Sequence, residues 1–355
     1  MTRRLWTILR LAIAVLFAAM PAVAASPPQA PRIVAIGDLH GDFAVWRDIA
    51  RGAGLVDSKG HWTGGRAVLV QVGDVVDREP DSLKIVRDLM RLQKEAAKQG
   101  GQVIALVGNH EAMNVTGDLR YVVPADFAEY STRNSAALRE RFYSSRKAEI
   151  EARARASDPS MTSAAIHDAW IKATPLGWVE QRLAWAPGGE EGRWVSRNPA
   201  VALVGGNLFV HGGLSAEYSK LPLAQINQKV DQALASVDRS DNSILTDPLG
   251  PLWYRGLITR DPKVTEIPIA AAAARPPIEQ ELETVLAAYG AKRIVVGHTP
   301  NLKGIQLHYD GRLATIDTGN SRFYGGPPSY LEIVGDKAVA HVVPRSAAAT
   351  GGGGE

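Results

Sequence analysis

The sequence predicts an α/β fold with a core of parallel strands. Short runs of β-branched and aliphatic residues, such as 32–36 and 102–107, have the continuous apolar character of strands buried on both faces. Early in the chain these runs alternate with segments whose apolar residues recur at helical spacing. A glycine-containing polar motif ends several of the runs, and in open α/β sheets ligands bind at the carboxyl ends of strands.

The segment from residue 32 to residue 114 contains two consecutive β–α–β units. Strands are expected at 32–36, 67–72 and 102–107. Phe43, Trp46 and Ile49 mark a helix after the first strand, and a second helix ends at the glycine pair 100–101. Two such units in succession predict right-handed crossovers and a parallel sheet.

The strand pattern is absent between about residues 115 and 200, where we predict an inserted helical cap over the active face. Helical patterns cover 127–130, 137–156 and 164–173, with a break at Asp158-Pro159. Most charges of the cap are expected to form a solvated surface. Its tryptophans are expected to pack the cap against the core rather than bind substrate: Trp170, Trp178, Trp185 and Trp194.

Strands return after residue 200. Residues 201–210 are apolar around a glycine pair, and helices are predicted at about 223–236 and 278–289, the second ended by Gly290. A strand at 293–296, another at 313–316 and a hairpin that turns at Gly335-Asp336 complete the domain. The Ala/Gly-rich tail, 347–355, is predicted to be disordered.

The first 25 residues have the features of a secretory signal peptide. Arg3, Arg4 and Arg10 surround or precede an apolar core, 11–20, that is too short to span a membrane. Residues 22–24, Ala-Val-Ala, fit the small-x-small cleavage rule. An uncleaved anchor is the alternative. We expect a periplasmic or secreted protein whose domain covers 26–346, without stable membrane insertion after cleavage.

Composition bears on two functional classes, nucleic-acid-binding proteins and enzymes with a cysteine nucleophile. The chain of 355 residues has 40 Lys and Arg against 37 Asp and Glu, and the three arginines of the N-terminal segment account for the whole excess. The basic isoelectric point is therefore poor evidence for nucleic-acid binding, and no nucleic-acid partner is expected. The chain has no Cys, so its fold depends on packing without disulfides and no cysteine nucleophile is present.

Five motifs place metal-binding residue types at the ends of predicted strands. They are Gly37-Asp38-Leu39-His40, Gly73-Asp74, Gly108-Asn109-His110-Glu111, His211-Gly212-Gly213 and Gly297-His298-Thr299. Any one of these polar residues is more often a turn former or a packing residue. Because all of them occur at successive strand ends, they jointly predict a metal site with two positions.

Two divalent ions about 3.5–4 Å apart can clamp a phosphate, activate a water and stabilise a leaving oxygen. Asp38 and His40 lie two residues apart, so on an extended strand end they would share a face and reach one ion. Asp74 is the expected bridge, since it belongs to the middle motif. Asn109, His211 and His298 would supply the second ion. This mixture of carboxylate, amide and imidazole suits Mn, Fe, Zn or Co better than Ca, with Mn foremost.

The motif set GDLHGD, GDVVDR, GNHE, VHGG and GHT resembles that of the calcineurin-like metallophosphoesterases, phosphoprotein phosphatase type. The sequences GNHEAMN and GPLWYRG further resemble the bacterial Shewanella-like branch. The likeness covers most of the chain from residue 32 to about 326, outside the cap. It implies a four-layer sandwich of two mixed β-sheets flanked by helices.

The resemblance also implies roles for named residues. Asp38, His40 and Asp74 would bind one metal, and Asp74, Asn109, His211 and His298 the other. His110 would be the general acid, oriented by Asp77, since a neighbouring carboxylate raises the pKa of an imidazole. Arg78 and Arg255 would hold phosphate oxygens, with Asn109 as a further substrate contact. A surface ion pair is the alternative for Arg255.

One position departs from many members of the superfamily. Pro300 stands where they carry a second His in the last motif, so the first ion would have one protein ligand fewer. The phosphoprotein phosphatase branch shares this lack. Residues 317–320, Asp-Thr-Gly-Asn, either close the site or form a structural turn.

Three functions are compatible with these motifs. The first is a secreted metal-dependent phosphomonoesterase, using a metal-activated water, that acts on phosphorylated Tyr, Ser or Thr or on a small phosphoester. The second keeps the chemistry but hydrolyses a nucleotide or dinucleoside polyphosphate, with a cap tryptophan stacking on the base. The third is a non-enzymatic metal-binding module, disfavoured because Asp77, Arg78 and His110 add little to metal binding alone.

Overall fold

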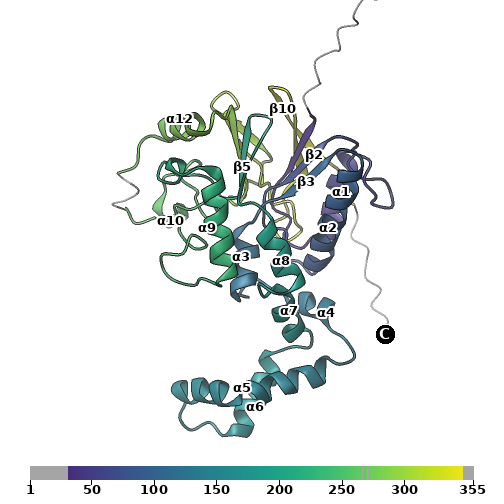
Figure 1. Ribbon diagram of the computed structural model, residues 1–355, viewed down its shortest axis with the longest axis vertical. Coiled ribbons are helices and arrows are strands. Elements are labelled where there is room, and N and C mark those ends of the chain that lie inside the picture. Colours follow the sequence, from purple (N-terminus) through teal and green to yellow (C-terminus); the bar gives the residue numbers. More distant parts are fainter. Residues whose placement is uncertain (1–30, 266, 270–271, 273, 347–355) are drawn as a thin grey trace, which may run out of the picture. The chain divides into compact units, whose positions relative to one another are not determined.

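The computed structural model describes residues 31–265, 267–269, 272 and 274–346. The predicted signal peptide and the Ala/Gly-rich tail lie outside the described residues. The described strands form two five-stranded sheets, and both mix parallel with antiparallel pairs (Figure 1). None of the described helices has the length and apolarity needed to cross a membrane.

The first sheet has the strand order β10-β9-β1-β2-β3. Its parallel strands are β1 (Ile33–Ile36), β2 (Val68–Gln71) and β3 (Gln102–Ala105). They are connected through α1 (Phe43–Gly52) and α2 (Ser82–Lys98), which confirms the two predicted β–α–β units. The hairpin of β9 (Ser329–Val334) and β10 (Lys337–Val342) pairs antiparallel with β1.

The second sheet has the strand order β4-β5-β6-β8-β7. Its parallel strands are β5 (Asn207–Val210), β6 (Arg293–Val296) and β8 (Leu313–Thr315), and its antiparallel edges are β4 (Val201–Val204) and β7 (Gln306–His308). Its helices include α9 (Leu223–Ala235) and α12 (Ile278–Tyr289). Sequence reasoning missed β7, the 3-10 turn η1 (Tyr218–Lys220) and α10 (Pro262–Thr265), because three or four residues carry too little periodicity.

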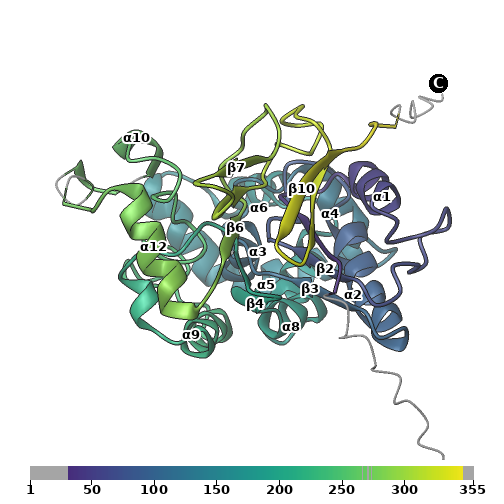
Figure 2. The same ribbon diagram turned by 90° about the horizontal axis from the view of Figure 1, so that it is seen from above.

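The two sheets pack against each other and are covered by helices on their outer faces. Alternate residues of β1 face opposite ways: Ile33 and Ala35 join the core between the sheets, whereas Val34 and Ile36 join the core beneath α1 and α2. A third core lies between the second sheet and α9 and α12. Figure 2 shows α12 and α1 on opposite sides of the strands. This is the four-layer sandwich expected from the resemblance.

The stretch between the sheets is helical. It comprises α3 (Asn109–Thr116), α4 (Pro124–Tyr130), α5 (Ser135–Ser157), α6 (Ser163–Ala173), α7 (Trp178–Trp185) and α8 (Glu190–Arg197). The described residues from 117 to 200 hold no strand. The hairpin of α5 and α6 packs on α7 and lies beyond α4 and α7 in Figure 1, rather than across the strand ends as expected.

The tryptophans of this stretch divide into two pairs. Trp185 and Trp194 are buried in the main core, where their indole N–H groups donate to Tyr130 Oη (2.8 Å) and Gln93 Oε1 (3.1 Å). Trp170 and Trp178 are only half-buried and line a pocket between α5, α6 and α7. The prediction that all four join the cap to the core is therefore correct for Trp185 and Trp194 and wrong for Trp170 and Trp178.

Candidate metal centre and active site

The strand ends bring the predicted ligands into one buried cluster. Asp38 and His40 follow β1, Asp74 follows β2, Asn109 and His110 begin α3 after β3, His211 follows β5 and His298 follows β6. All are at most 6% exposed. Because both sheets end their parallel strands at this place, residues 260 positions apart come into contact: the backbone N–H of His298 donates to Asp38 Oδ1 at 3.2 Å.

The potential metal-binding atoms form two groups that share Asp74, and the first of them also includes the predicted acid, His110. One group is His40, Asp74 and His110, and the other is Asp74, His211 and His298, each with its ligand atoms within 4.8 Å of one another. Asp74 Oδ2 lies 3.3 Å from His211 Nε2 and 4.0 Å from His40 Nε2. Asp38 Oδ2 joins the first group at 3.9 Å from His40 Nε2, and Asn109 Oδ1 the second at 2.9 Å from His211 Nε2. The shared position of Asp74 is the one a bridging carboxylate needs.

Asp38 and His40 meet for a different reason than expected. The backbone is not extended there: His40 has a φ of 45°, in the left-handed region, and lies in a turn. The N–H groups of Leu39 and His40 donate to the carbonyl of Asp74 at 2.9 and 3.0 Å. The turn therefore folds the two side chains together and also fixes them to the second motif.

Several site residues other than glycine occupy the left-handed region, which is strained for side chains with a Cβ. Besides His40 they are Asp74 (φ 54°), Asp77 (72°), Arg78 (70°) and His298 (65°). Gly73 is required by crowding, since a Cβ there would lie 2.8 Å from His211 Nδ1.

His110 and Asp77 form a hydrogen-bonded pair. His110 Nδ1 lies 2.6 Å from Asp77 Oδ2, and Asn114 Nδ2 donates to the other carboxylate oxygen at 2.9 Å. Gln181 Nε2, on α7, donates to Asn114 Oδ1 at 2.8 Å and fixes that amide. Burial lowers the pKa of the His110 imidazole, but the carboxylates of Asp74 and Asp77 outweigh it, so the pKa is raised above its ordinary value. The two carboxylates thus favour the protonated form of His110.

Two arginines border the cluster. The Arg78 guanidinium lies among three aromatic rings, with its Cζ 4.1 Å from the centre of Tyr121, 4.9 Å from Phe323 and 5.5 Å from Tyr324. Its Nε is buried without a hydrogen-bond partner among the described residues. Arg255 is half-buried, and its charge, after burial and His211, helps to hold the pKa of His298 well below its ordinary value. Both arginines therefore lie beside the ligand cluster.

Comparisons with known proteins agree with this geometry. Residues 31–302 match the calcineurin-like phosphoesterase family. The chain belongs to this family.

Its curated relatives include Shewanella-like protein phosphatase 2 of Arabidopsis thaliana, 33% identical over 87% of this chain and 76% of the relative. Shewanella-like protein phosphatase 1 of Plasmodium berghei is 30% identical over 85% and 71%. The fold matches the crystal structure of a cold-active protein-tyrosine phosphatase of a psychrophilic Shewanella species, with a TM-score of 0.62, 23% identity and coverage of 88% and 78%. The chain is a hydrolase of the phosphatase type.

The calcineurin-like phosphoesterases take divalent metals, and the donor atoms of this chain fit them. His211 Nδ1 lies 2.9 Å from the carbonyl of Val72, which leaves Nε2 of the neutral ring as an acceptor. That acceptor nevertheless faces two oxygens, Asn109 Oδ1 and Asp74 Oδ2. His298 Nε2 is buried with no hydrogen-bond partner among the described residues. Cations between these atoms would satisfy them all.

Charge crowding in this phosphoesterase site leads to the same conclusion. Burial, Asp317 and Asp74 raise the pKa of Asp38 well above its ordinary value. Burial and Asp74 raise the pKa of Glu111 to about 7, and burial, again with Asp74, raises that of Asp317 to about 6. So many buried carboxylates resist ionisation unless positive charge lies among them.

Sequence reasoning missed several residues that position the phosphoesterase ligands. Glu111 accepts hydrogen bonds from the backbone N–H groups of Asp74 (2.9 Å), Val75 (2.9 Å) and Gly108 (2.8 Å), so it ties the second motif to the third. Its place three residues after Gly108, at the start of α3, is the capping-box position and was the available signal. Asn114, Gln181, Tyr121 and Phe323 gave no such signal.

The segment 317–320 lies beside the first ligand. Asn320 Nδ2 donates to the Asp38 carbonyl at 3.1 Å, and Asp317 Oδ1 accepts from the N–H of Gly319 at 2.9 Å. The Asp317 carboxylate also lies near enough to Asp38 to raise the pKa of that carboxyl group. The segment is an irregular stretch that contacts the first ligand through Asn320, so it lies against the site rather than forming a separate regular turn.

Proposed function

We propose that this chain is an exported, metal-dependent phosphomonoesterase that removes phosphate from tyrosine, serine or threonine side chains of proteins. The observation that carries the proposal is the His110–Asp77 pair. His110 Nε2 lies 3.7 Å from Oδ2 of Asp74, the carboxylate common to both ligand groups. A proton donor beside a shared metal ligand is useful for cleaving an ester with a poor leaving group. The names of the relatives, which refer to protein and protein-tyrosine phosphatases, support the substrate class.

The proposed mechanism assigns each step to residues of the chain. Two divalent ions, held by Asp38, His40 and Asp74 and by Asp74, Asn109, His211 and His298, would neutralise phosphate charge and provide a nucleophile at neutral pH. Arg78 and Arg255 bind phosphate oxygens, and the rings around Arg78 keep its guanidinium in place. His110 donates its Nε2 proton to the departing oxygen, while Asp77 keeps the ring oriented through Nδ1.

Manganese is the metal we propose first, with Fe, Zn or Co as alternatives. Three imidazoles, carboxylates and one amide form a mixed donor set, which favours these ions over calcium. Metal analysis of the protein purified from its native compartment, followed by reconstitution with each ion, tests the choice.

The proposed location is the periplasm or the outside of the cell. It is supported by the arginines before a short apolar stretch and by the Ala-Val-Ala sequence at 22–24. The first residue of the mature protein decides it: mass spectrometry of the exported fraction should find a chain that begins near Ala25 or Ser26. A chain that starts at Met1 in that fraction would contradict cleavage.

The experiment for the function as a whole is a substrate panel with the manganese-loaded mature protein. Phosphopeptides carrying phosphotyrosine, phosphoserine or phosphothreonine should be hydrolysed, and a chelator should abolish turnover. A diadenosine polyphosphate included in the same panel tests the nucleotide alternative. Hydrolysis of the nucleotide far above that of every phosphopeptide would overturn the proposal, and failure on all phosphate esters would favour a metal-binding module.

A further inference from the structure

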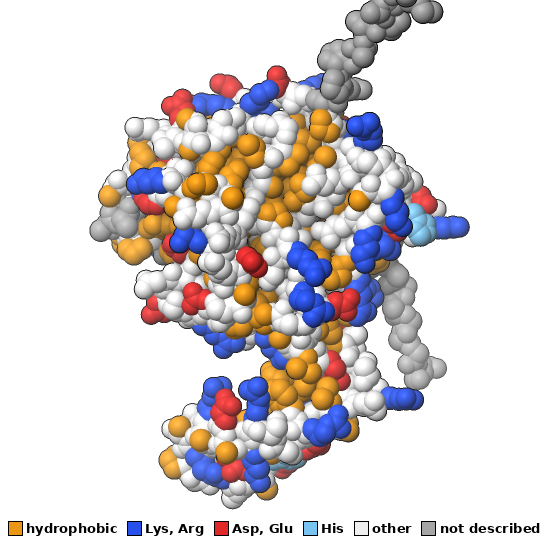
Figure 3. All heavy atoms as spheres, in the orientation of Figure 1, with side chains coloured by type: hydrophobic (Ala, Val, Ile, Leu, Met, Phe, Trp, Pro, Cys, Tyr) orange, Lys and Arg blue, Asp and Glu red, His pale blue; other side chains and the backbone are white. Residues whose placement is uncertain are grey.

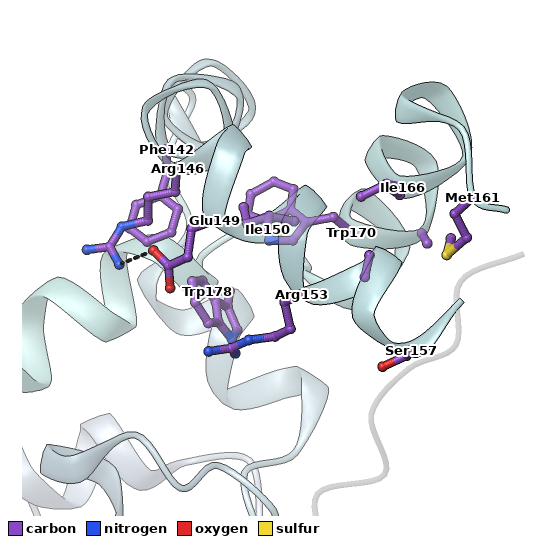
Figure 4. A pocket seen from close by; sticks show the side chains of 12 residues that line it. Phe142, Arg146, Glu149, Ile150, Arg153, Ser157, Met161, Ile166, Trp170 and Trp178 are labelled. Atoms are coloured by element: carbon purple, nitrogen blue, oxygen red, sulfur yellow. Dashed lines mark ion pairs between the residues drawn. The ribbon is translucent and has the colours of Figure 1, made fainter. Parts of the chain in front are cut away.

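The hairpin of α5 and α6 encloses an apolar pocket away from the metal centre. The cavity measures about 470 Å³ and is lined mainly by Phe142, Ile150, Met161, Ile166, Trp170 and Trp178. Figure 4 shows the rings of Phe142, Trp170 and Trp178 gathered between the helices. A cavity of this size can accept two or three large side chains of a ligand. It shares no residue with the metal cluster.

The hairpin buries few of its own side chains, which leaves the pocket between its helices open. The 23 residues of α5 have only Ser135, Tyr143 and Glu151 buried, and α6 has only Ile166. Residues 142, 146, 150, 153 and 157 of α5 follow helical spacing and line the pocket as one face. Solvent-exposed apolar side chains that gather in a concave group often mark a binding site.

Charge at the rim indicates which ligand fits. Arg146 pairs with Glu149 at 3.9 Å and lies 4.8 Å over the Phe142 ring. Arg153, which reaches toward Trp178 in Figure 4, makes no ion pair with any described residue. The whole of α5 carries six basic and three acidic residues, and Figure 3 shows Lys and Arg side chains beside apolar ones on this hairpin. The complementary partner is acidic as well as apolar.

We propose that this pocket docks an acidic segment with aromatic or large aliphatic side chains that belongs to the phosphorylated protein substrate. Docking would hold the substrate on the hairpin while its phosphate ester occupies the metal centre, so the identity of the partner rests on the proposed function. A membrane surface is disfavoured because the three rings are turned into a hollow between helices, whereas interfacial helices present such rings outward on one face.

A binding experiment tests the pocket independently of catalysis. The probe is a synthetic peptide of alternating Glu and Phe or Leu, and a matched peptide carries Lys in place of Glu. Tryptophan fluorescence should report binding of the acidic peptide only. Ala169→Phe fills the pocket from an exposed lining position, and Ala164→Phe is its control on the other side of α6. Arg153→Glu reverses the charge of Arg153 at the rim of the pocket, and Arg141→Glu is its control outside the pocket lining.

Ala169→Phe and Arg153→Glu should each weaken binding by about tenfold or more, whereas both controls should leave it within about twofold. Circular dichroism of the four variants checks that the hairpin still folds. Equal binding of the basic peptide, or equal loss in the controls, would overturn the inference. Two further results would also overturn the inference, because each assigns the pocket another occupant. One is that Ala169→Phe weakens binding to phosphatidylglycerol vesicles but not to the peptide. The other is that the protein forms a dimer and Ala169→Phe disrupts it.

A kinetic experiment tests whether the docked partner is the substrate. One phosphopeptide is made alone and also joined to the acidic–apolar segment through short, medium and long Gly/Ser linkers. At the best linker length KM should fall by about tenfold or more at unchanged kcat, and Ala169→Phe should abolish this gain. Turnover of p-nitrophenyl phosphate should be the same in all variants. If the peptide binds but the linked substrate shows no decrease in KM, the substrate assignment is overturned. Absence of all hydrolysis would instead refute the proposed function.

Discussion

The strand-end cluster and the α5–α6 hairpin depart from ordinary folding in opposite ways. The cluster buries ionisable side chains: Asp38, Asp74 and His211 are each at most 2% exposed. The hairpin leaves apolar rings half-exposed around an open cavity. Buried charge and exposed apolar surface are the two features that folding alone does not favour. The first is balanced when cations bind, and the second when a partner does, so each departure identifies the kind of ligand that its region takes.

The largest loss is expected where the two ligand groups meet. Asp74→Asn removes the shared carboxylate, so transition-state stabilisation of several kcal/mol should be lost, or about 10³-fold in kcat/KM. Metal content measured by elemental analysis should fall with it. Asp168→Asn, at an exposed position on α6, is the matched control and should change neither. If Asp74→Asn kept both metals, the bridging role would be wrong.

His110→Asn should give the next largest effect, and its size should depend on the substrate. An alkyl phosphate has a poor leaving group, so its turnover should fall by about 10²-fold or more. p-Nitrophenyl phosphate needs little protonation of its leaving oxygen and should lose much less. The two kcat/KM ratios measured side by side decide the matter, since an equal loss on both substrates would remove His110 from the acid role.

Glu111→Ala should act through the backbone rather than through the chemistry. It leaves the N–H groups of Asp74, Val75 and Gly108 without their acceptor, so the free energy of unfolding should fall by about 3 kcal/mol or more. Metal affinity should weaken by about 10–100-fold, as is typical when an outer-shell partner is lost. Denaturant unfolding and metal titration measure the two effects. Glu190→Ala, at an exposed position of α8, should show neither.

Asp77→Asn should produce the smallest change, a shift of the pH profile. Asp77 helps to raise the pKa of His110, and the protonated imidazole is the acid, so activity on alkyl phosphates falls as pH rises through that pKa. Without the carboxylate the pKa is lower, and the alkaline limb of kcat/KM should move to lower pH. The limb for p-nitrophenyl phosphate should move less. An unchanged or alkaline-shifted limb for the alkyl substrate would contradict the pair.

The sequence was sufficient wherever a motif followed a strand of clear apolar character. β1, β2, β5 and β6 were predicted with their polar ends, and these ends converge because parallel strands finish at the same edge. The predicted geometry of Asp38 and His40 was wrong. We expected an extended strand end, but the backbone of His40 is in the left-handed region. Local pattern does not show where the backbone leaves the strand.

What stayed hidden depends on contacts between distant segments. Gln181 donates a hydrogen bond to Asn114, 67 residues earlier in the sequence. Phe323 contacts Arg78 although it lies near the C-terminal end of the domain sequence. Neither has a spacing that reveals its partner. Trp178 and Trp185 belong to the same helix, yet one lines the hairpin pocket and the other joins the core. Helical spacing shows that apolar residues share or avoid a face, but it does not show which neighbour will cover that face.

The left-handed backbone at His40, Asp74, Asp77, Arg78 and His298 has a consequence for directed evolution of this protein. Each such conformation costs on the order of 1 kcal/mol, which glycine would relieve. A campaign that selects only for heat resistance would therefore favour glycine at these five positions. The selected proteins would be more stable but would lack metal ligands, the Asp77 carboxylate that orients His110, or the Arg78 guanidinium. Any such screen should therefore measure turnover in the same round.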